Sequence, residues 1–163
     1  MTIGPSKINY NYIGVWQRYL LETTAIKDDS SLVLWIQSQH YHIDVRIPAI
    51  CTGFKTASAL QDYSDAELML LASQQGFAGL TCVTPSTVTS SEVCQWLREM
   101  DYQAPTDARD IGKMVFTDAD TVIETGVDDA YLEVWRRLNN IQEPCIFEMT
   151  TGINRKGLSP YYS

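Results

Sequence analysis

Residues 40–47 read HYHIDVRI, a strict alternation of polar and apolar side chains. Alternate residues of a β-strand point to opposite faces. One face is apolar and carries Tyr41, Ile43, Val45 and Ile47. The opposite face is ionisable and carries His40, His42, Asp44 and Arg46. The ionisable face is either an ordinary solvated exterior or the inside of a barrel, where an arginine could hold a carboxylate or enolate oxygen while an aspartate or histidine exchanges a proton.

Further segments rich in Val, Ile, Thr and aromatic residues recur at short intervals between polar or Gly/Pro/Asp/Asn joints. This spacing predicts a sandwich or a barrel. The expected strands cover residues 12–22, 31–38, 40–47, 77–84, 92–102, 112–117, 120–125, 130–138 and 145–150. Residues 92–102 also fit a helix, because Val93, Trp96, Leu97 and Met100 follow the i, i+3, i+4, i+7 pattern.

One helix is expected over residues 64–75, where Leu68 and Leu71 follow a capping box that starts at Ser64. Gly76 is expected to end this helix in the left-handed conformation. A single helix cannot supply the crossovers of a parallel sheet. The sequence therefore predicts a mainly β fold: one domain over residues 1–163, built as an antiparallel β-barrel of eight to nine strands with one short amphipathic helix and a polar tail at 151–163.

The net charge of -8, from 20 acidic and 12 basic residues, disfavours nucleic acid and anionic lipid surfaces as partners. No stretch approaches the roughly 20 apolar residues that span a bilayer, and the first residues lack the apolar segment of a signal peptide. We therefore expect a cytoplasmic protein without a membrane partner. The four cysteines are widely spaced and form no zinc pattern, which favours free thiols.

Two more strands mix aromatic and charged side chains on one face, which suits a ligand site with apolar walls and a few polar groups. In the first strand this face carries Cys94, Trp96, Arg98, Met100 and Tyr102, and the opposite face carries Gln95, Leu97, Glu99 and Asp101. In the second strand it carries Tyr131, Glu133, Trp135 and Arg137, opposite Leu132, Val134, Arg136 and Leu138. The alternative is that the aromatic residues are core and Arg98 extends outward. Arg136 must reach a rim or a buried partner.

Gly14-Val15-Trp16, together with Arg136 and Arg137, resembles the lipocalin signature, in which an early Gly-x-Trp indole packs beneath an arginine and plugs one end of the barrel. The ordered segments IGVWQRYLLE, HIDVRIP, QQGFAG, CQWLREMDYQAP, DIGKMVF and ETGVDDAYLEVWRR resemble the lipocalin-like family named for a fungal protein that interacts with a casein-kinase-type kinase, and its uncharacterised bacterial relatives.

This resemblance covers roughly residues 13–138 and implies a fold more than an activity. It singles out, without assigning roles, Trp16, Asp44, Arg46, Trp96, Arg98, Asp101, Glu133 and Trp135. The resemblance also implies a further strand pair after Arg137, whereas CIFEMT is followed here by the polar GINRKGLSPYYS. An open seam is therefore one expectation, and a homodimer is one way to shield it.

The best-supported functional prediction is binding of a small, partly apolar organic molecule in the barrel lumen. The expected ligand-binding residues are Trp16, Trp35, Tyr41, His42, Trp96, Arg98, Tyr102, Glu133 and Trp135. No cofactor is expected, and no metal site either, because His40 and His42 lack an identifiable third ligand. The chain shows no Gly-x-Ser-x-Gly motif and no phosphate loop.

The alternative prediction is an enzyme on the same scaffold, of isomerase, cyclase or decarboxylase type, as the resemblance implies. Arg46 would be its electrostatic clamp and Asp44 or Asp101 its general acid or base, with Tyr41 or Tyr102 as a hydroxyl donor. The third prediction is a protein-interaction domain, suggested by the kinase-binding namesake and the acidic surface.

Overall fold

The computed structural model describes residues 8–51, 53–54, 57–85, 91–104, 106 and 109–138. The strands within these ranges are β1 (Gly14–Thr23), β2 (Lys27–Asp28), β3 (Leu32–Gln37), β4 (Tyr41–Ile47), β5 (Gln75–Pro85), β6 (Glu92–Asp101), β7 (Asp110–Phe116), β8 (Thr121–Gly126) and β9 (Tyr131–Arg137). The helix α1 (Asp65–Ala72) and three 3-10 turns, η1 (Tyr10–Tyr12), η2 (Ala49–Cys51) and η3 (Leu60–Asp62), complete the described elements.

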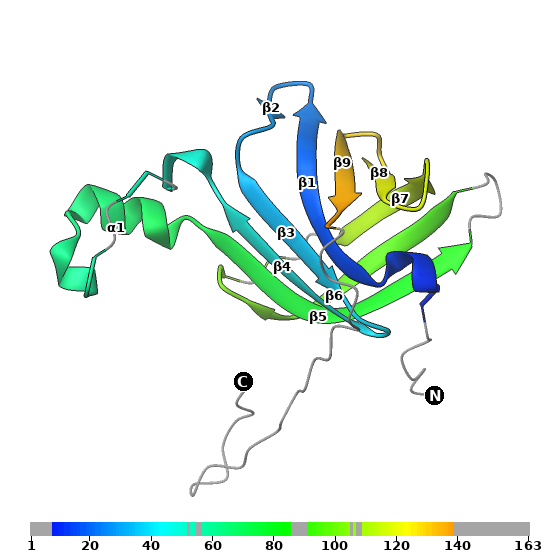
Figure 1. Ribbon diagram of the computed structural model, residues 1–163, viewed down its shortest axis with the longest axis horizontal. Coiled ribbons are helices and arrows are strands. Elements are labelled where there is room, and N and C mark those ends of the chain that lie inside the picture. The colour runs from blue at the N-terminus through cyan, green and yellow to red at the C-terminus, as the bar shows by residue number, and fades with distance from the viewer. Residues whose placement is uncertain are drawn as a thin grey trace, which may run out of the picture.

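The strands form a closed antiparallel barrel (Figure 1). Neighbours along the chain pair from β3 to β9, and β9 returns to β1 with a register from Trp16 opposite Arg137 to Thr23 opposite Tyr131. The barrel therefore closes within one chain, a point that the sequence left undecided. Strand β1 pairs with two other strands at the seam: its first half pairs with β3, and most of its length pairs with β9. A bulge between Arg18 and Leu20 bends the strand there.

Because the barrel is closed, it has no open seam that a second copy would need to shield. The homodimer stays a prediction. The short strand β2, which pairs with the second half of β1, was not anticipated. The strand expected at 145–150 lies outside the described residues. Residues 92–101 form a strand and not a helix.

The helix begins as expected, with the Ser64 side chain accepting from the Glu67 backbone N–H and the Glu67 side chain returning to Ser64. It ends at Ser73 in right-handed conformation, and Gly76 already belongs to β5. The prediction of a left-handed stop at Gly76 is therefore wrong, because strand pairing with Val45 takes this glycine. The helix lies beside the barrel in the β4–β5 connection and buries none of its residues (Figure 1).

The aromatic core of the barrel includes four buried indoles, those of Trp16, Trp35, Trp96 and Trp135. Trp35 stands at the centre, stacked on Trp16 at 5.8 Å between ring centroids. It meets Trp96 and Trp135 edge-on, also at 5.8 Å. Such geometries stabilise aromatic pairs beyond the surface they bury.

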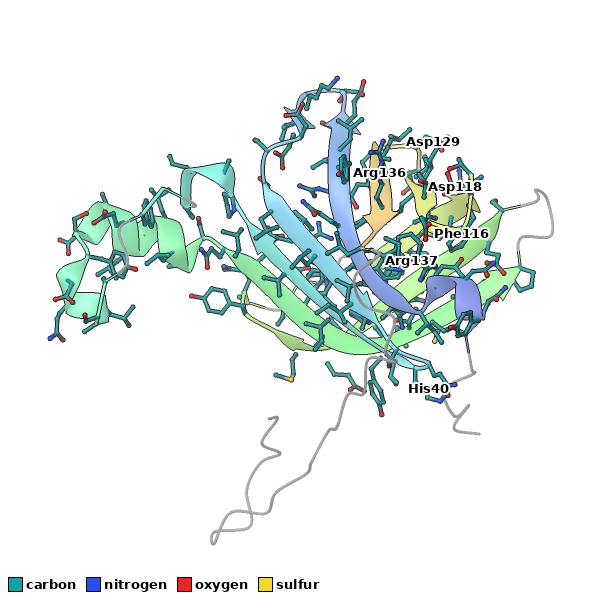
Figure 2. All side chains as sticks on the ribbon, in the orientation of Figure 1. His40, Phe116, Asp118, Asp129, Arg136 and Arg137 are labelled. Carbon is teal, nitrogen blue, oxygen red and sulfur yellow. The ribbon has the colours of Figure 1, made fainter. Side chains whose placement is uncertain are left out.

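One end of the barrel is plugged in the manner that the Gly-x-Trp signature predicts. The Trp16 indole N–H donates to the Tyr12 carbonyl oxygen at 2.9 Å, and the Arg137 guanidinium lies 4.2 Å from the Trp16 ring centroid. Arg137 also donates to the carbonyl oxygens of Ile13 and Asn11. Arg136, its neighbour on β9, is exposed and lies over the Tyr19 ring (Figure 2).

The described cysteines, Cys51, Cys82 and Cys94, are free thiols, as predicted. Within the described ranges, no helix has the length and apolar character needed to cross a bilayer.

Candidate functional site

The ionisable face of β4 lines the inside of the barrel. His42 and Asp44 are buried, whereas Val45, on the other face of the strand, is 37% exposed. The sequence left open whether this face points into the barrel or toward solvent, and in the structure it points into the barrel. Tyr41 shares the outer face with Val45, and it does not reach the lumen.

Two arginines and three carboxylates form an ionic network that includes Asp44 and Arg46 of β4. Arg46 bonds Asp44 through two nitrogens, at 2.7 and 3.2 Å, and its Nη1 lies 3.9 Å from Glu133. Arg18 donates to Glu133 at 2.8 Å and to Asp28 at 2.7 Å. Burial of charge is offset here by close pairing. Arg46 is therefore engaged with protein carboxylates and is not a free clamp for a ligand.

Burial raises the pKa of both inward carboxyls next to Arg46. The pKa of Asp44 rises because the side chain is desolvated, although the Arg46 guanidinium opposes the change. The pKa of Glu133 rises for the same reason, opposed by Arg46 and Arg18. Groups whose protonation energies are shifted in this way are candidates for binding or proton transfer.

Glu124 is a third inward carboxyl, which the sequence reasoning missed. Burial, and then the nearby Glu133, raise its pKa to about 8. Its oxygens accept from the Tyr131 hydroxyl at 2.7 Å and from the Trp135 indole N–H at 3.1 Å. The signal was present, because period-two alternation along residues 121–126 puts Val122 and Glu124 on one face.

Little free space remains between these groups. A cavity of about 10 Å³ lies among Trp35, Asp44, Arg46, Phe77, Trp96, Asp110, Glu124 and Trp135. This volume suits about one water molecule, and small-molecule sites usually span about 300–1,000 Å³. Side chains fill the lumen that the sequence predicted as the ligand container.

A larger space opens where β6 and β7 separate. The register of β7 on β6 ends with Trp96 opposite Asp110, while β6 continues to Asp101. A cleft of about 440 Å³ follows this free length of β6. Its described lining is Gln95, Trp96, Leu97, Arg98, Glu99, Met100, Asp101, Thr106, Arg109 and Asp110. We call this space the β6/β7 cleft. Trp96 and Asp110 line both the cleft and the inner cavity.

Arg98 stands between the cleft and the interior. It donates to Asp110 at 3.0 and 2.8 Å and to Asp101 at 2.9 Å. Its guanidinium carbon lies 3.5 Å from the centroid of the buried Phe77 ring. The Arg98 side chain is therefore held by two carboxylates and by a cation–π contact, and it is still 36% exposed.

A bulge brings Asp101 to Arg98. Ala78 pairs with Met100 but Gly79 pairs with Arg98, so Glu99 is an extra residue on β6. Beyond it the alternation is reversed, and Asp101 faces the same side as its partner Phe77. Strict alternation predicted the opposite. A side chain at Gly79 would overlap the Leu97 carbonyl oxygen, so this close approach requires glycine.

The structure therefore divides the sequence-predicted site residues into three groups. The barrel interior holds Trp16, Trp35, His42, Asp44, Arg46, Trp96, Glu133 and Trp135. The cleft holds Arg98 and Asp101. Tyr41 and Tyr102 lie outside the lumen, Tyr102 with 64% exposure. The inward polar residues that sequence reasoning missed include Arg18, Gln37, Thr81, Asp110 and Glu124.

No group of three or more His, Cys, Asp or Glu side chains with metal-binding geometry occurs among the residues that the structure describes. No family model, curated protein or solved structure matches the chain. The fold is that of a lipocalin-like barrel, and membership of the family named above stays a prediction.

Proposed function

We propose that this protein binds a small, partly apolar organic molecule at the β6/β7 cleft, which forms the entrance to the filled barrel. The observation that carries the proposal is the cleft itself, whose volume of about 440 Å³ falls in the range of small-molecule sites. Its wall includes Trp96, which also borders the interior.

The lining indicates the chemistry of the ligand. Trp96, Leu97 and Met100 offer apolar surface for a flat or aliphatic body. Among the described residues the charged lining is net negative, because it has three carboxylates, those of Glu99, Asp101 and Asp110, and two guanidiniums, those of Arg98 and Arg109. A neutral or cationic ligand with hydroxyl or amine donors fits this balance better than a carboxylate does.

The test uses two naphthalene probes, 2-naphthol and 2-naphthoate, with the full chain. Titration followed by NMR of the tryptophan indole N–H groups reports the location, since the chain has four tryptophans. We expect 2-naphthol to bind more tightly than 2-naphthoate and to shift the Trp96 signal most. Equal shifts of all four indoles, or none, would count against the cleft as the site.

A matched pair of variants tests the charge of the lining. Asp110→Asn neutralises a carboxylate that lines the cleft, whereas Asp129→Asn makes the same change at an exposed carboxylate paired with Lys113. We expect D110N to narrow the preference for 2-naphthol over 2-naphthoate, because the variant removes one negative charge from the cleft lining, and D129N to keep the wild-type preference. An unchanged preference in D110N would exclude Asp110 from the site.

Acid–base catalysis is the second candidate, favoured by one observation. Asp44 and Glu124, two carboxyls with raised pKa, line the same small cavity next to Arg46. Buried carboxyls with raised pKa can hold a proton and transfer it to a bound molecule. The test is exchange of the acidic α-protons of 2-tetralone in D₂O. Acceleration by the wild type that disappears in Asp44→Asn would support catalysis, and exchange at the buffer rate would exclude it for this ketone.

A further inference from the structure

His42 presents one ring nitrogen that the described part of the chain leaves without a partner. The side chain is fully buried on the inner face of β4, and its Nε2 makes no hydrogen bond there. Buried polar atoms are nearly always paired, and leaving one unpaired costs free energy. Whether Nε2 carries a proton or a lone pair follows from three neighbouring residues, Gln37, Thr81 and Arg98.

The first step is the orientation of Gln37. Its Nε2 donates to the carbonyl oxygens of Ser38 at 3.0 Å and Tyr41 at 2.9 Å. The amide nitrogen is therefore on that side, and Oε1 is the acceptor on the other. Oε1 receives the Trp35 indole N–H at 3.0 Å and the Thr81 hydroxyl at 2.8 Å.

The second step is the tautomer of His42. The hydroxyl of Thr81 has a single hydrogen, and that hydrogen is donated to Gln37. Thr81 Oγ1 lies 3.2 Å from His42 Nδ1 and can only accept there. Nδ1 therefore carries the ring proton, and Nε2 carries a lone pair. Burial and the charge of Arg98 lower the pKa of His42 to about 4, so the ring is neutral near pH 7.

The third step is the position of His42 relative to Arg98, which lines the cleft. His42 pairs with Gly79, and Gly79 pairs with Arg98, so the three lie side by side on the inner wall. Adjacent strands are about 4.8 Å apart, which puts His42 and Arg98 on the order of 10 Å apart between Cα atoms, with only a glycine between them. Phe77 contacts both, with its ring centroid 5.9 Å from the His42 ring.

We propose that His42 Nε2 accepts a hydrogen bond from the molecule bound at the β6/β7 cleft, which therefore carries an O–H or N–H group that reaches past Arg98. This inference rests on the proposed function and narrows it, because it names the group that the ligand must present. The buried lone pair would distinguish donors from equally apolar molecules without a donor, since a site built to accept a hydrogen bond rejects analogues that cannot make one.

The experiment compares 2-naphthol with 2-methoxynaphthalene, which has the same aromatic body but no donor. The full chain is labelled with ¹⁵N-histidine and observed near pH 7. The chain has two histidines, and His40, at the β3–β4 turn (Figure 2), is assigned by a His40→Gln variant. We expect the free protein to show His42 with an unprotonated Nε2. 2-Naphthol should shift this resonance, and 2-methoxynaphthalene should not.

Two variants separate the hydrogen bond from packing. His42→Phe keeps an aromatic ring beside Phe77, and Thr81→Val keeps the shape of the side chain while removing the group that sets the tautomer. We expect 2-naphthol to bind the wild type about tenfold more tightly than 2-methoxynaphthalene. This preference should disappear in H42F and decrease in T81V, where Nε2 is free to take the proton.

The outcomes separate the two proposals. The inference about His42 is wrong if 2-naphthol binds at Trp96 without shifting the Nε2 resonance of His42. It is also wrong if H42F still prefers 2-naphthol over 2-methoxynaphthalene. In both cases the proposal that the cleft binds the ligand is unaffected. A protonated Nε2 in the free protein would also overturn it. If neither probe binds, the proposed function fails for aromatic ligands, and the role of His42 fails with it.

Discussion

Glutamine in place of Glu124 tests the electrostatics of the barrel interior. Glu124 is buried and accepts hydrogen bonds from Tyr131 and Trp135. Its pKa is raised from 4.5 to about 8, first by burial and then by Glu133. Glutamine keeps the size and an acceptor oxygen but has no proton to lose. Glu124→Gln therefore removes one titration from the folded state.

The sign follows from proton linkage. Between pH 4.5 and about 8, the unfolded chain has released the Glu124 proton while the folded protein still holds it. Stability then falls as pH rises, by up to about 1.4 kcal/mol per pH unit. Between about pH 6 and pH 8 the expected loss from this group is therefore on the order of 2–3 kcal/mol.

The assay is urea unfolding of the wild type and E124Q at several values across that pH range. We expect the difference in unfolding free energy between the two proteins to shift in favour of E124Q as the pH rises. A constant offset between them is irrelevant, because glutamine satisfies Tyr131 and Trp135 differently. Parallel pH profiles would show that Glu124 is ionised throughout, and would refute the argument from burial.

Other substitutions test other parts of the interior. The pKa of His42 falls from 6.5 to about 4 on folding, so the unfolded chain takes up this proton at a higher pH than the folded protein. Stability should therefore be lost as the pH falls between those values. Thermal melts at a series of pH values should show that H42F lacks this dependence. Arg18→Met should destabilise by about 3–5 kcal/mol, since it removes the close partner of the buried Glu133 and leaves the longer ion pair to Arg46 at 3.9 Å. Arg136→Met, on the exposed side of β9, should cost less than about 1 kcal/mol by the same denaturation assay, and equal losses in the two variants would contradict the burial difference.

Part of the site was readable from single strands. Residues 40–47, 92–97 and 131–137 alternate regularly, so the shared face of His42 and Asp44, or of Glu133 and Trp135, followed from the sequence. The same rule failed after Glu99, because a bulge adds a residue without a sequence signal and reverses the facing of Asp101. Tyr102, expected beside Trp96 in the lumen, lies outside for this reason.

The sequence by itself determined the local features: most of the strands, their two-sided character, and the capped start of the helix at Ser64. These depend on the side-chain period of a strand and on hydrogen bonds between residues close in the chain. Tertiary structure alone decided which face of β4 turns inward and that β9 closes on β1. It also decided that side chains leave a cavity of only about 10 Å³ inside the barrel, and that a cleft lies where β6 extends beyond its pairing with β7. Those outcomes depend on register and on packing between residues far apart in sequence, which no single strand specifies.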